Sequence, residues 1–199
     1  MKVDQGISFG LWDDPVSRFL YIDCMSLFLS DIDIKQYKRV ADYGGGNGLL
    51  KRFIPQAISI DIDEDKCPDI VDDILIHTGD YDLIFIRYVL HYLSEQQISQ
   101  LFLNLKDYNG QLMLIQFAND GIDLQIKKAN SLNEGKKYFR DSTELLSLLN
   151  QHLKIDQLKA QTLSITPEFY LNRLGNPYTT DHIETIYFIS GKIRSNNAE

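Results

Sequence analysis

Hydrophobic and polar residues follow two different periods along this chain, and the changes between the periods predict strands and helices in turn. Short continuous apolar runs are typical of strands that are covered on both faces, whereas apolar residues at every third or fourth position are typical of amphipathic helices. The apolar runs predict strands at 38–43, 57–61, 69–74, 81–87, 111–117, 154–165 and 183–192.

The helical spacing predicts helices at 16–30, 47–53, from Ser94 onward, in part of 120–137, and at 143–153. Ser94 precedes Gln97 by three positions, which is the spacing of a capping box, and apolar residues follow at helical intervals. Either Asp141 or Ser142 can serve as the N-cap of the helix at 143–153. Pro55 ends the short helix at 47–53.

Strands that alternate with helices predict an α/β fold: a Rossmann-like, doubly wound sheet of seven strands with helices on both faces. The last two predicted strands have no helix between them, so we expect a β-hairpin that makes the final strand antiparallel in a mostly parallel sheet. No linker or repeat divides the chain, which predicts a single domain over 1–199.

Charge and composition exclude several classes of function. Lys and Arg total 20 against 28 acidic residues, a net charge of −8, so a nucleic-acid interface is not expected. The most apolar stretch, 82–93, contains Asp82, Arg87 and His91 and is too short to span a bilayer. Two cysteines in unrelated settings and an N-terminus without a signal sequence indicate a reducing compartment. We therefore expect a cytoplasmic protein without membrane insertion.

The stretch VADYGGGNGLL at 40–50 places four glycines directly after a predicted strand. In an open α/β sheet, ligands bind beyond the carboxyl ends of the strands, and glycine lets the backbone turn tightly and approach the ligand. The dinucleotide pattern G-x-G-x-x-G fails here, because Leu49 or Asn47 occupies a required glycine position. This speaks against a nicotinamide-dependent oxidoreductase, which is the first alternative function.

The stretch fits D-x-G-x-G-x-G instead, with Asp42, Gly44, Gly46 and Gly48 at the defined positions. It thereby resembles motif I of the class I S-adenosylmethionine (SAM)-dependent methyltransferases. The resemblance implies that SAM is the cofactor, that the glycine loop wraps its methionine half, and that Asp42 helps to orient its amino group.

Residues downstream of the loop extend this resemblance. Asp61 ends the second predicted strand, 17 residues after Gly44, where the family has an acid that accepts both ribose hydroxyls. Ile62 would then lie against the adenine. Asp73 matches the acid that accepts from the adenine amino group, with Asp72 as the alternative if the register differs by one.

Two more residues complete the expected cofactor contacts. Ile74, the residue after Asp73, belongs to the predicted cofactor site. Arg87 ends the fourth predicted strand, where the resemblance implies that its backbone carbonyl meets the ammonium group of the cofactor. Asp42, Gly44, Gly46, Gly48, Asp61, Ile62, Asp73, Ile74 and Arg87 therefore form the predicted cofactor site. The resemblance covers roughly residues 38–117, the expected cofactor-binding half, between an N-terminal helical cap (1–36) and a substrate-side half (118–199).

His91 is the candidate catalytic residue. The stretch VLHYLSEQQ resembles the region of small-molecule O-methyltransferases in which the histidine is the general base, although Tyr92 and Leu93 replace residues usual there. In methyltransferases with other acceptors, a histidine at this place only positions groups. No acid ends the fourth strand, so a magnesium-dependent reaction is not expected and no metal site is predicted.

These observations predict a methyltransferase that transfers the methyl group of SAM to a small-molecule acceptor, first of all to a hydroxyl. The alternatives are transfer to nitrogen or carbon, with His91 only positional, and a SAM-binding scaffold without catalysis. The acceptor would be a metabolite, a sugar or lipid intermediate, or a natural-product intermediate. The sequence leaves the oligomeric state open.

Overall fold

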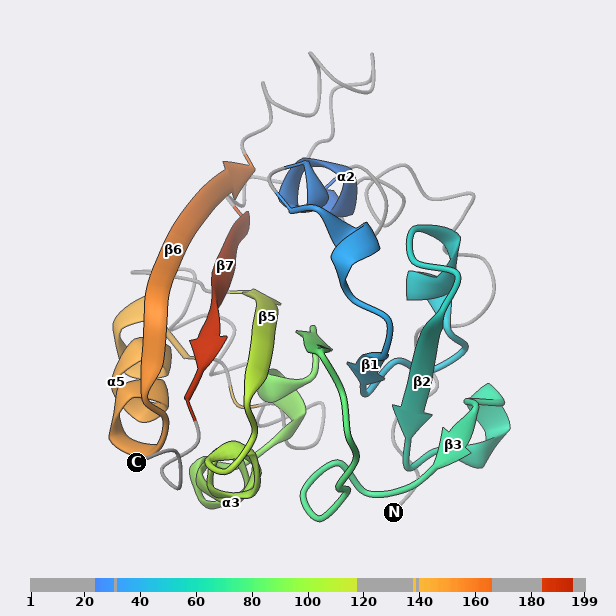
Figure 1. Ribbon diagram of the computed structural model, residues 1–199. Coiled ribbons are helices and arrows are strands. Elements are labelled where there is room, and N and C mark those ends of the chain that lie inside the picture. Colours follow the sequence, from blue (N-terminus) through green and yellow to red (C-terminus); the bar gives the residue numbers. More distant parts are fainter. Residues whose placement is uncertain (1–23, 31, 118–137, 139, 166–183, 195–199) are drawn as a thin grey trace.

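A computed structural model describes residues 24–30, 32–117, 138, 140–165 and 184–194 of the chain (Figure 1). Within these ranges, one sheet contains seven strands in the order β3-β2-β1-β4-β5-β7-β6. The strands are β1 (Val40–Tyr43), β2 (Ala57–Asp61), β3 (Ile70–Val71), β4 (Leu83–Arg87), β5 (Gly110–Phe117), β6 (Ile155–Ile165) and β7 (Glu184–Ile193).

Strands β1 to β5 are parallel, and β7 is antiparallel to both of its neighbours, β5 and β6. The predicted fold class, including the antiparallel last strand, is confirmed. The strand order reverses at β1, which pairs with β2 on one side and with β4 on the other. Because ligands bind beside such a reversal, the carboxyl ends of β1, β2 and β4 are the expected floor of a site.

Three α-helices fall within the described part of the chain: α2 (Cys24–Leu29), α3 (Glu95–Leu105) and α5 (Ser142–His152). The capping box predicted for α3 is present, because the side chains of Ser94 and Gln97 each bond to the other's backbone N–H. Asp141 and Glu144 form a second capping box, so Asp141 rather than Ser142 is the N-cap of α5. None of the helices in these ranges has the length and apolar character that crossing a membrane requires.

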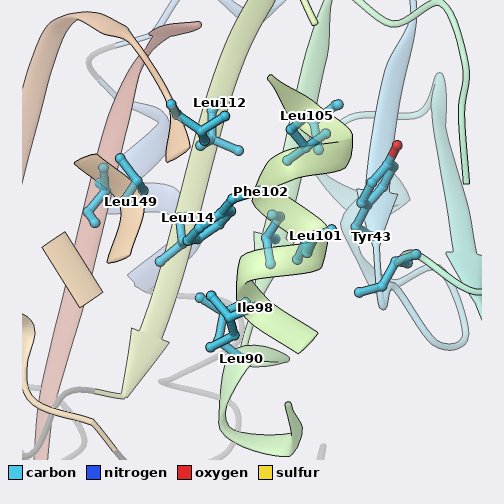
Figure 2. Close-up of a cluster of buried hydrophobic side chains, with 14 of the residues drawn as sticks. Tyr43, Leu90, Ile98, Leu101, Phe102, Leu105, Leu112, Leu114 and Leu149 are labelled. Carbon is cyan, nitrogen blue, oxygen red and sulfur yellow. The ribbon is translucent and has the colours of Figure 1, made fainter. Parts of the chain in front are cut away.

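Apolar side chains fill both faces of the sheet. On one face, α3 contributes the four apolar residues of its predicted buried stripe, Ile98, Leu101, Phe102 and Leu105 (Figure 2). They pack with residues from the sheet and from α5, among them Tyr43, Leu112, Leu114 and Leu149. On the other face, α2 packs Met25 and Phe28 against a second core cluster. Full burial of each such side chain stabilises the folded protein by about 1.5–3 kcal/mol. The two apolar layers therefore hold the strand ends in fixed positions.

Two sequence-based boundaries were wrong. The helix predicted at 47–53 is a short 3-10 helix, η3 (Leu49–Arg52), because Gly48 before it is left-handed and Pro55 follows soon after. The strand predicted at 69–74 shortens to β3, because Asp69 and Asp72 turn their carboxylates to other parts of the chain, Ser59 and His77. The first part of the predicted helix at 16–30 and the whole segment 120–137 lie outside the described residues.

Candidate functional site

The glycine loop after β1 lies against the end of β2. The backbone N–H groups of Gly44 and Gly45 both donate to the carbonyl of Ile60, at 2.8 and 3.2 Å. Gly44, Gly46 and Gly48 have φ angles of +69°, +52° and +73°, a left-handed backbone that residues with a Cβ rarely adopt. The three glycines of the D-x-G-x-G-x-G pattern therefore serve the conformation of this turn.

Gly45, which the pattern leaves unspecified, is required for a different reason. A Cβ on Gly45 would lie 2.8 Å from both the carbonyl oxygen and the carboxylate Oδ2 of Asp42. The sequence analysis missed this residue, although the unbroken run of three glycines at 44–46 was the available signal. The backbone thus passes directly over the carboxylate of Asp42.

The carboxylate of Asp42 binds the guanidinium of Arg87. Arg87 Nε donates to Oδ1 at 3.0 Å and Arg87 Nη2 donates to Oδ2 at 2.5 Å, and both side chains are buried. This pairing fixes β1 to β4 just below the loop. Both oxygens of Asp42 accept from Arg87, and the Asp42 side chain is only 1% exposed, so its carboxylate holds Arg87 in place beneath the loop.

Asp61, at the end of β2, holds the other side of the loop. Its Oδ2 accepts from the N–H of Gly46 at 2.9 Å, and its Oδ1 accepts from the N–H of Asp63 at 3.0 Å. Lys66 Nζ lies 3.8 Å from Oδ2. A carboxylate oxygen has two lone pairs, so each oxygen can still accept one hydroxyl of a vicinal diol. The structure thus places the predicted ribose acid beside the predicted glycine loop.

Gly46 keeps the space beside this carboxylate open. A Cβ on Gly46 would have only Lys66 Cδ at 3.4 Å and Asp61 Oδ2 at 3.9 Å as its nearest neighbours. The left-handed φ of Gly46 already favours glycine, and a Cβ would in addition fill the space next to the carboxylate. This is the position at which a ligand held by Asp61 would meet the backbone.

Three apolar side chains near the ends of β2 and β3 are exposed. Ile62 is 64% exposed, Val71 56% and Ile76 68%, although apolar residues of this size are usually covered. Ile62 directly follows Asp61, as the adenine contact was expected to do. Ile74, which was also predicted to contact the cofactor, instead belongs to the buried core cluster. Ile62 therefore places an exposed apolar side chain directly after Asp61.

Asp72 and Asp73 are used differently in the turn that follows β3. Asp72 Oδ2 bonds to His77 Nδ1 at 2.7 Å, and this bond holds the pKa of Asp72 below its usual range. His77 Nε2 lies 3.0 Å from the hydroxyl of Tyr81, whose pKa is raised by burial and by the charge of Asp72. Tyr81 therefore stays protonated near neutral pH. A carboxylate accepts hydrogen bonds, so Nδ1 of His77 carries a proton and donates to Asp72.

The carboxylate of Asp73 can accept a further hydrogen bond. Its Oδ1 accepts from the N–H of Leu75 at 2.9 Å, and its Oδ2 takes part in no hydrogen bond with the described residues. The N–H of Asp72 donates to the carbonyl of Asp61 at 3.0 Å, which brings the turn next to the ribose acid. Of the two alternatives in the sequence, Asp73 is the one with an available oxygen.

His91 lies in the 3-10 helix η5 (Leu90–Tyr92), which follows β4, and its side chain is buried. Its Nδ1 lies 3.1 Å from Nε2 of Gln116, while the N–H of Leu90 donates to Oε1 of the same amide at 3.1 Å. Arg140 donates to the carbonyls of Leu90 and Leu93, at 3.1 and 2.9 Å. Partial burial lowers the pKa of Arg140.

The sequence analysis missed Gln116 and Arg140. Gln116 is a polar residue in the otherwise apolar stretch LMLIQF, which was a usable signal in the sequence. In the structure it is only 2% exposed. Arg140 lies far from His91 in the sequence and offered none. Among the described residues, no three His, Cys, Asp or Glu side chains gather as metal ligands would.

No family model matches the sequence, and no curated protein matches it either. Solved structures do match the fold. A SAM-dependent methyltransferase from Thermotoga maritima has a TM-score of 0.62 at 13% identity, over 94% of this chain and 100% of that chain. Magnesium protoporphyrin IX methyltransferase from Synechocystis, with bound S-adenosylhomocysteine (SAH), has a TM-score of 0.61 at 17% identity, over 96% and 95%.

Human N-acetylserotonin methyltransferase in complex with SAM is a more distant match, with a TM-score of 0.53 at 15% identity. The match covers 96% of this chain and 60% of the human one. At such low identities the common feature is the arrangement of the strands and helices. The chain has the fold of the class I SAM-dependent methyltransferases.

Proposed function

We propose that this protein is an enzyme that binds SAM at the carboxyl ends of β1, β2 and β3 and transfers its methyl group to a small-molecule acceptor. The observation that carries the proposal is the position of Asp61. Its carboxylate lies beside an open glycine position, is anchored by two backbone N–H groups, and keeps lone pairs for a ribose diol.

The surrounding residues suit the other parts of the cofactor. The exposed side chain of Ile62 offers an apolar surface to the adenine, and the second oxygen of Asp73 can accept from its amino group. The loop at Gly44–Gly48 would enclose the methionine half, with the backbone carbonyl of Arg87 on the other side. SAH and SAM occupy solved structures with the same fold, which supports this assignment.

Bound SAM would supply an electrophilic methyl group on a sulfonium. The chain's own residues then have to hold the acceptor in line with that methyl group and to keep water away. The methyl transfer can proceed in two ways, which differ in the role of His91. In one, His91 removes the proton of a hydroxyl acceptor. In the other, the acceptor is nitrogen or carbon, or needs no base, and His91 positions groups only.

Calorimetry with SAH tests the cofactor assignment. We expect SAH to bind, and Asp61→Asn to weaken binding at least tenfold, because one oxygen that accepts from the ribose is replaced by an amide donor. Asp65→Asn, a neutralised exposed carboxylate in the neighbouring turn, is the matched control and should bind as the unmodified protein does. Equal affinities of the Asp61 variant and the control would contradict the ribose assignment.

A thermal-shift comparison separates SAM from a dinucleotide. A ligand at one hundred times its dissociation constant stabilises the protein by about 2.7 kcal/mol. We expect such stabilisation from SAH and none from NAD, and the reverse result would favour the oxidoreductase. Incubation with SAM and a metabolite extract, followed by mass spectrometry for one added methyl group, then identifies the acceptor. Binding of SAH without any methylated product would support the non-catalytic scaffold.

A further inference from the structure

The side-chain amide of Gln116 bridges the segment that carries His91. Gln116 lies on β5 and is almost fully buried. One end of its amide accepts from the backbone N–H of Leu90, and the other end lies 3.1 Å from Nδ1 of His91. The two contacts therefore use both ends of a single planar group.

The contact with Leu90 decides which way this amide faces. A backbone N–H can only donate, so the group opposite Leu90 must be the carbonyl oxygen of Gln116. The NH₂ group then faces His91, and an amide NH₂ can only donate. Nδ1 of His91 must therefore be the acceptor and cannot carry a proton. In a neutral imidazole the proton then resides on Nε2.

We propose that His91 is held as the Nε2–H tautomer by Gln116, so that it acts as a hydrogen-bond donor and not as the general base. This rests on the proposed methyl transfer and chooses between its two versions. A base has to accept a proton on a nitrogen with an available lone pair, but the lone pair of Nδ1 is taken by Gln116 and Nε2 already bears a hydrogen.

The tautomer limits the class of acceptor. Methyl transfer to a neutral hydroxyl forms the C–O bond, breaks the S–CH₃ bond and releases the hydroxyl proton, which His91 in this state does not take up. An oxygen that is already anionic at neutral pH, such as a carboxylate, uses one lone pair to attack and leaves no proton to remove. Its other lone pairs can accept from Nε2–H. The geometry therefore favours an anionic oxygen acceptor.

The backbone around His91 is fixed well enough to preserve this arrangement. Arg140 donates to the carbonyls of Leu90, the first residue of η5, and Leu93, which follows it. The N–H of Tyr138 donates to the carbonyl of His91 at 2.6 Å. These bonds hold the segment against β5, so the N–H of Leu90 keeps facing Gln116.

Nitrogen-15 NMR of histidine-labelled protein tests the proposal directly. Long-range proton–nitrogen correlations show which ring nitrogen is protonated, and His91→Gln identifies the signal. We expect His91 to have its proton on Nε2. His77 is the internal reference for a protonated Nδ1, because its Nδ1 donates to the carboxylate of Asp72. A proton on Nδ1 of His91 in the unmodified protein would overturn the proposal.

Gln116→Glu provides the second measurement. A carboxylate can accept from both Leu90 N–H and Nδ1–H, so we expect this variant to move a proton onto Nδ1 of His91 while His77 keeps its pattern. An unprotonated Nδ1 in a folded variant would count against the proposal, and the first measurement decides alone if the variant does not fold. Neither result depends on SAH binding. Failure of SAH to bind would overturn the proposed function and leave the tautomer standing.

Discussion

Asp42 on β1 and Arg87 on β4 form a two-pronged ion pair, with exposed side-chain fractions of 1% and 6%. The pair joins the two strands at which the order of the sheet reverses, directly beneath the glycine loop. A buried charge that loses its partner is far more costly than the intact pair is favourable. The pair therefore links the stability of the sheet to the shape of the loop.

Arg87→Met should destabilise the protein by about 3–5 kcal/mol, because it leaves the carboxylate of Asp42 buried without a cation. Replacing both partners, with Asp42→Leu and Arg87→Met, should restore much of that loss. Urea unfolding measures both variants. The control is Arg39→Met, which removes an exposed pair with Asp82 and should cost about 1 kcal/mol or less. A single Arg87 variant as stable as this control would contradict the argument.

Gly45→Ala and Gly46→Ala should affect different properties. A Cβ on Gly45 would overlap with Asp42, so this variant should lose stability. A Cβ on Gly46 meets no atom closer than 3.4 Å and adds only the strain of a left-handed residue, about 1–2 kcal/mol. It would, however, fill the space beside Asp61. We expect Gly46→Ala to have the smaller effect in urea unfolding and a large effect on SAH affinity by calorimetry. Unchanged SAH affinity would exclude a ligand at this position.

Substitution of Asp73 should affect the recognition of the cofactor, whereas substitution of Asp72 should affect the stability of the protein. Asp73→Ser keeps a side-chain acceptor for Leu75 N–H but removes the oxygen assigned to the adenine amino group. The variant should lose about tenfold in affinity for SAH and little for its inosine analogue, which lacks that amino group. Asp72→Ala should lower stability through His77 and leave the preference between the two ligands unchanged. Loss of the preference in the Asp72 variant alone would reverse the assignment.

Asp82 should contribute to acid unfolding. Hydrogen bonds from the side chain and backbone of Arg39, together with the N–H of Lys38, lower the pKa of Asp82 from 3.8 to about 2. A lowered pKa means that the stabilisation is complete above about pH 4 and is lost as the pH falls toward 2. Asp82→Asn should therefore show a smaller fall in the free energy of unfolding across this interval. Asp65→Asn is the control, and an equal fall in both variants would refute the assignment.

Local signals in the sequence predicted the elements that local interactions determine. Ser94 and Gln97 lie three positions apart and cap the same helix, so the start of α3 could be read directly. The end of β3 could not be predicted in this way, because it depends on a hydrogen bond between Asp72 and His77. The glycine turn after β1 could be predicted from the motif, whereas the need for Gly45 follows from its distance to a folded carboxylate.

The same limit applies to the site. Asp42 could be picked out because it begins the glycine motif, and Asp61 because it ends the second apolar strand. The partner of Asp42 could not, because Arg87 is 45 positions away and only its backbone carbonyl was expected to take part in the site. Gln116 stands out as a polar residue in an apolar stretch, but its role could not be predicted, since the direction of its amide depends on Leu90, a backbone donor from another element.

The β1–β4 register brings together segments that are far apart along the chain, so β4 has to pair with β1 before the loop acquires its final shape. A fragment that ends before β4 would contain every glycine of the motif and still lack the cation beneath it. Hydrogen exchange at the amides of β1 and the loop should consequently slow together when a nucleoside is bound, and the recognition of a small molecule would report on the integrity of the whole sheet.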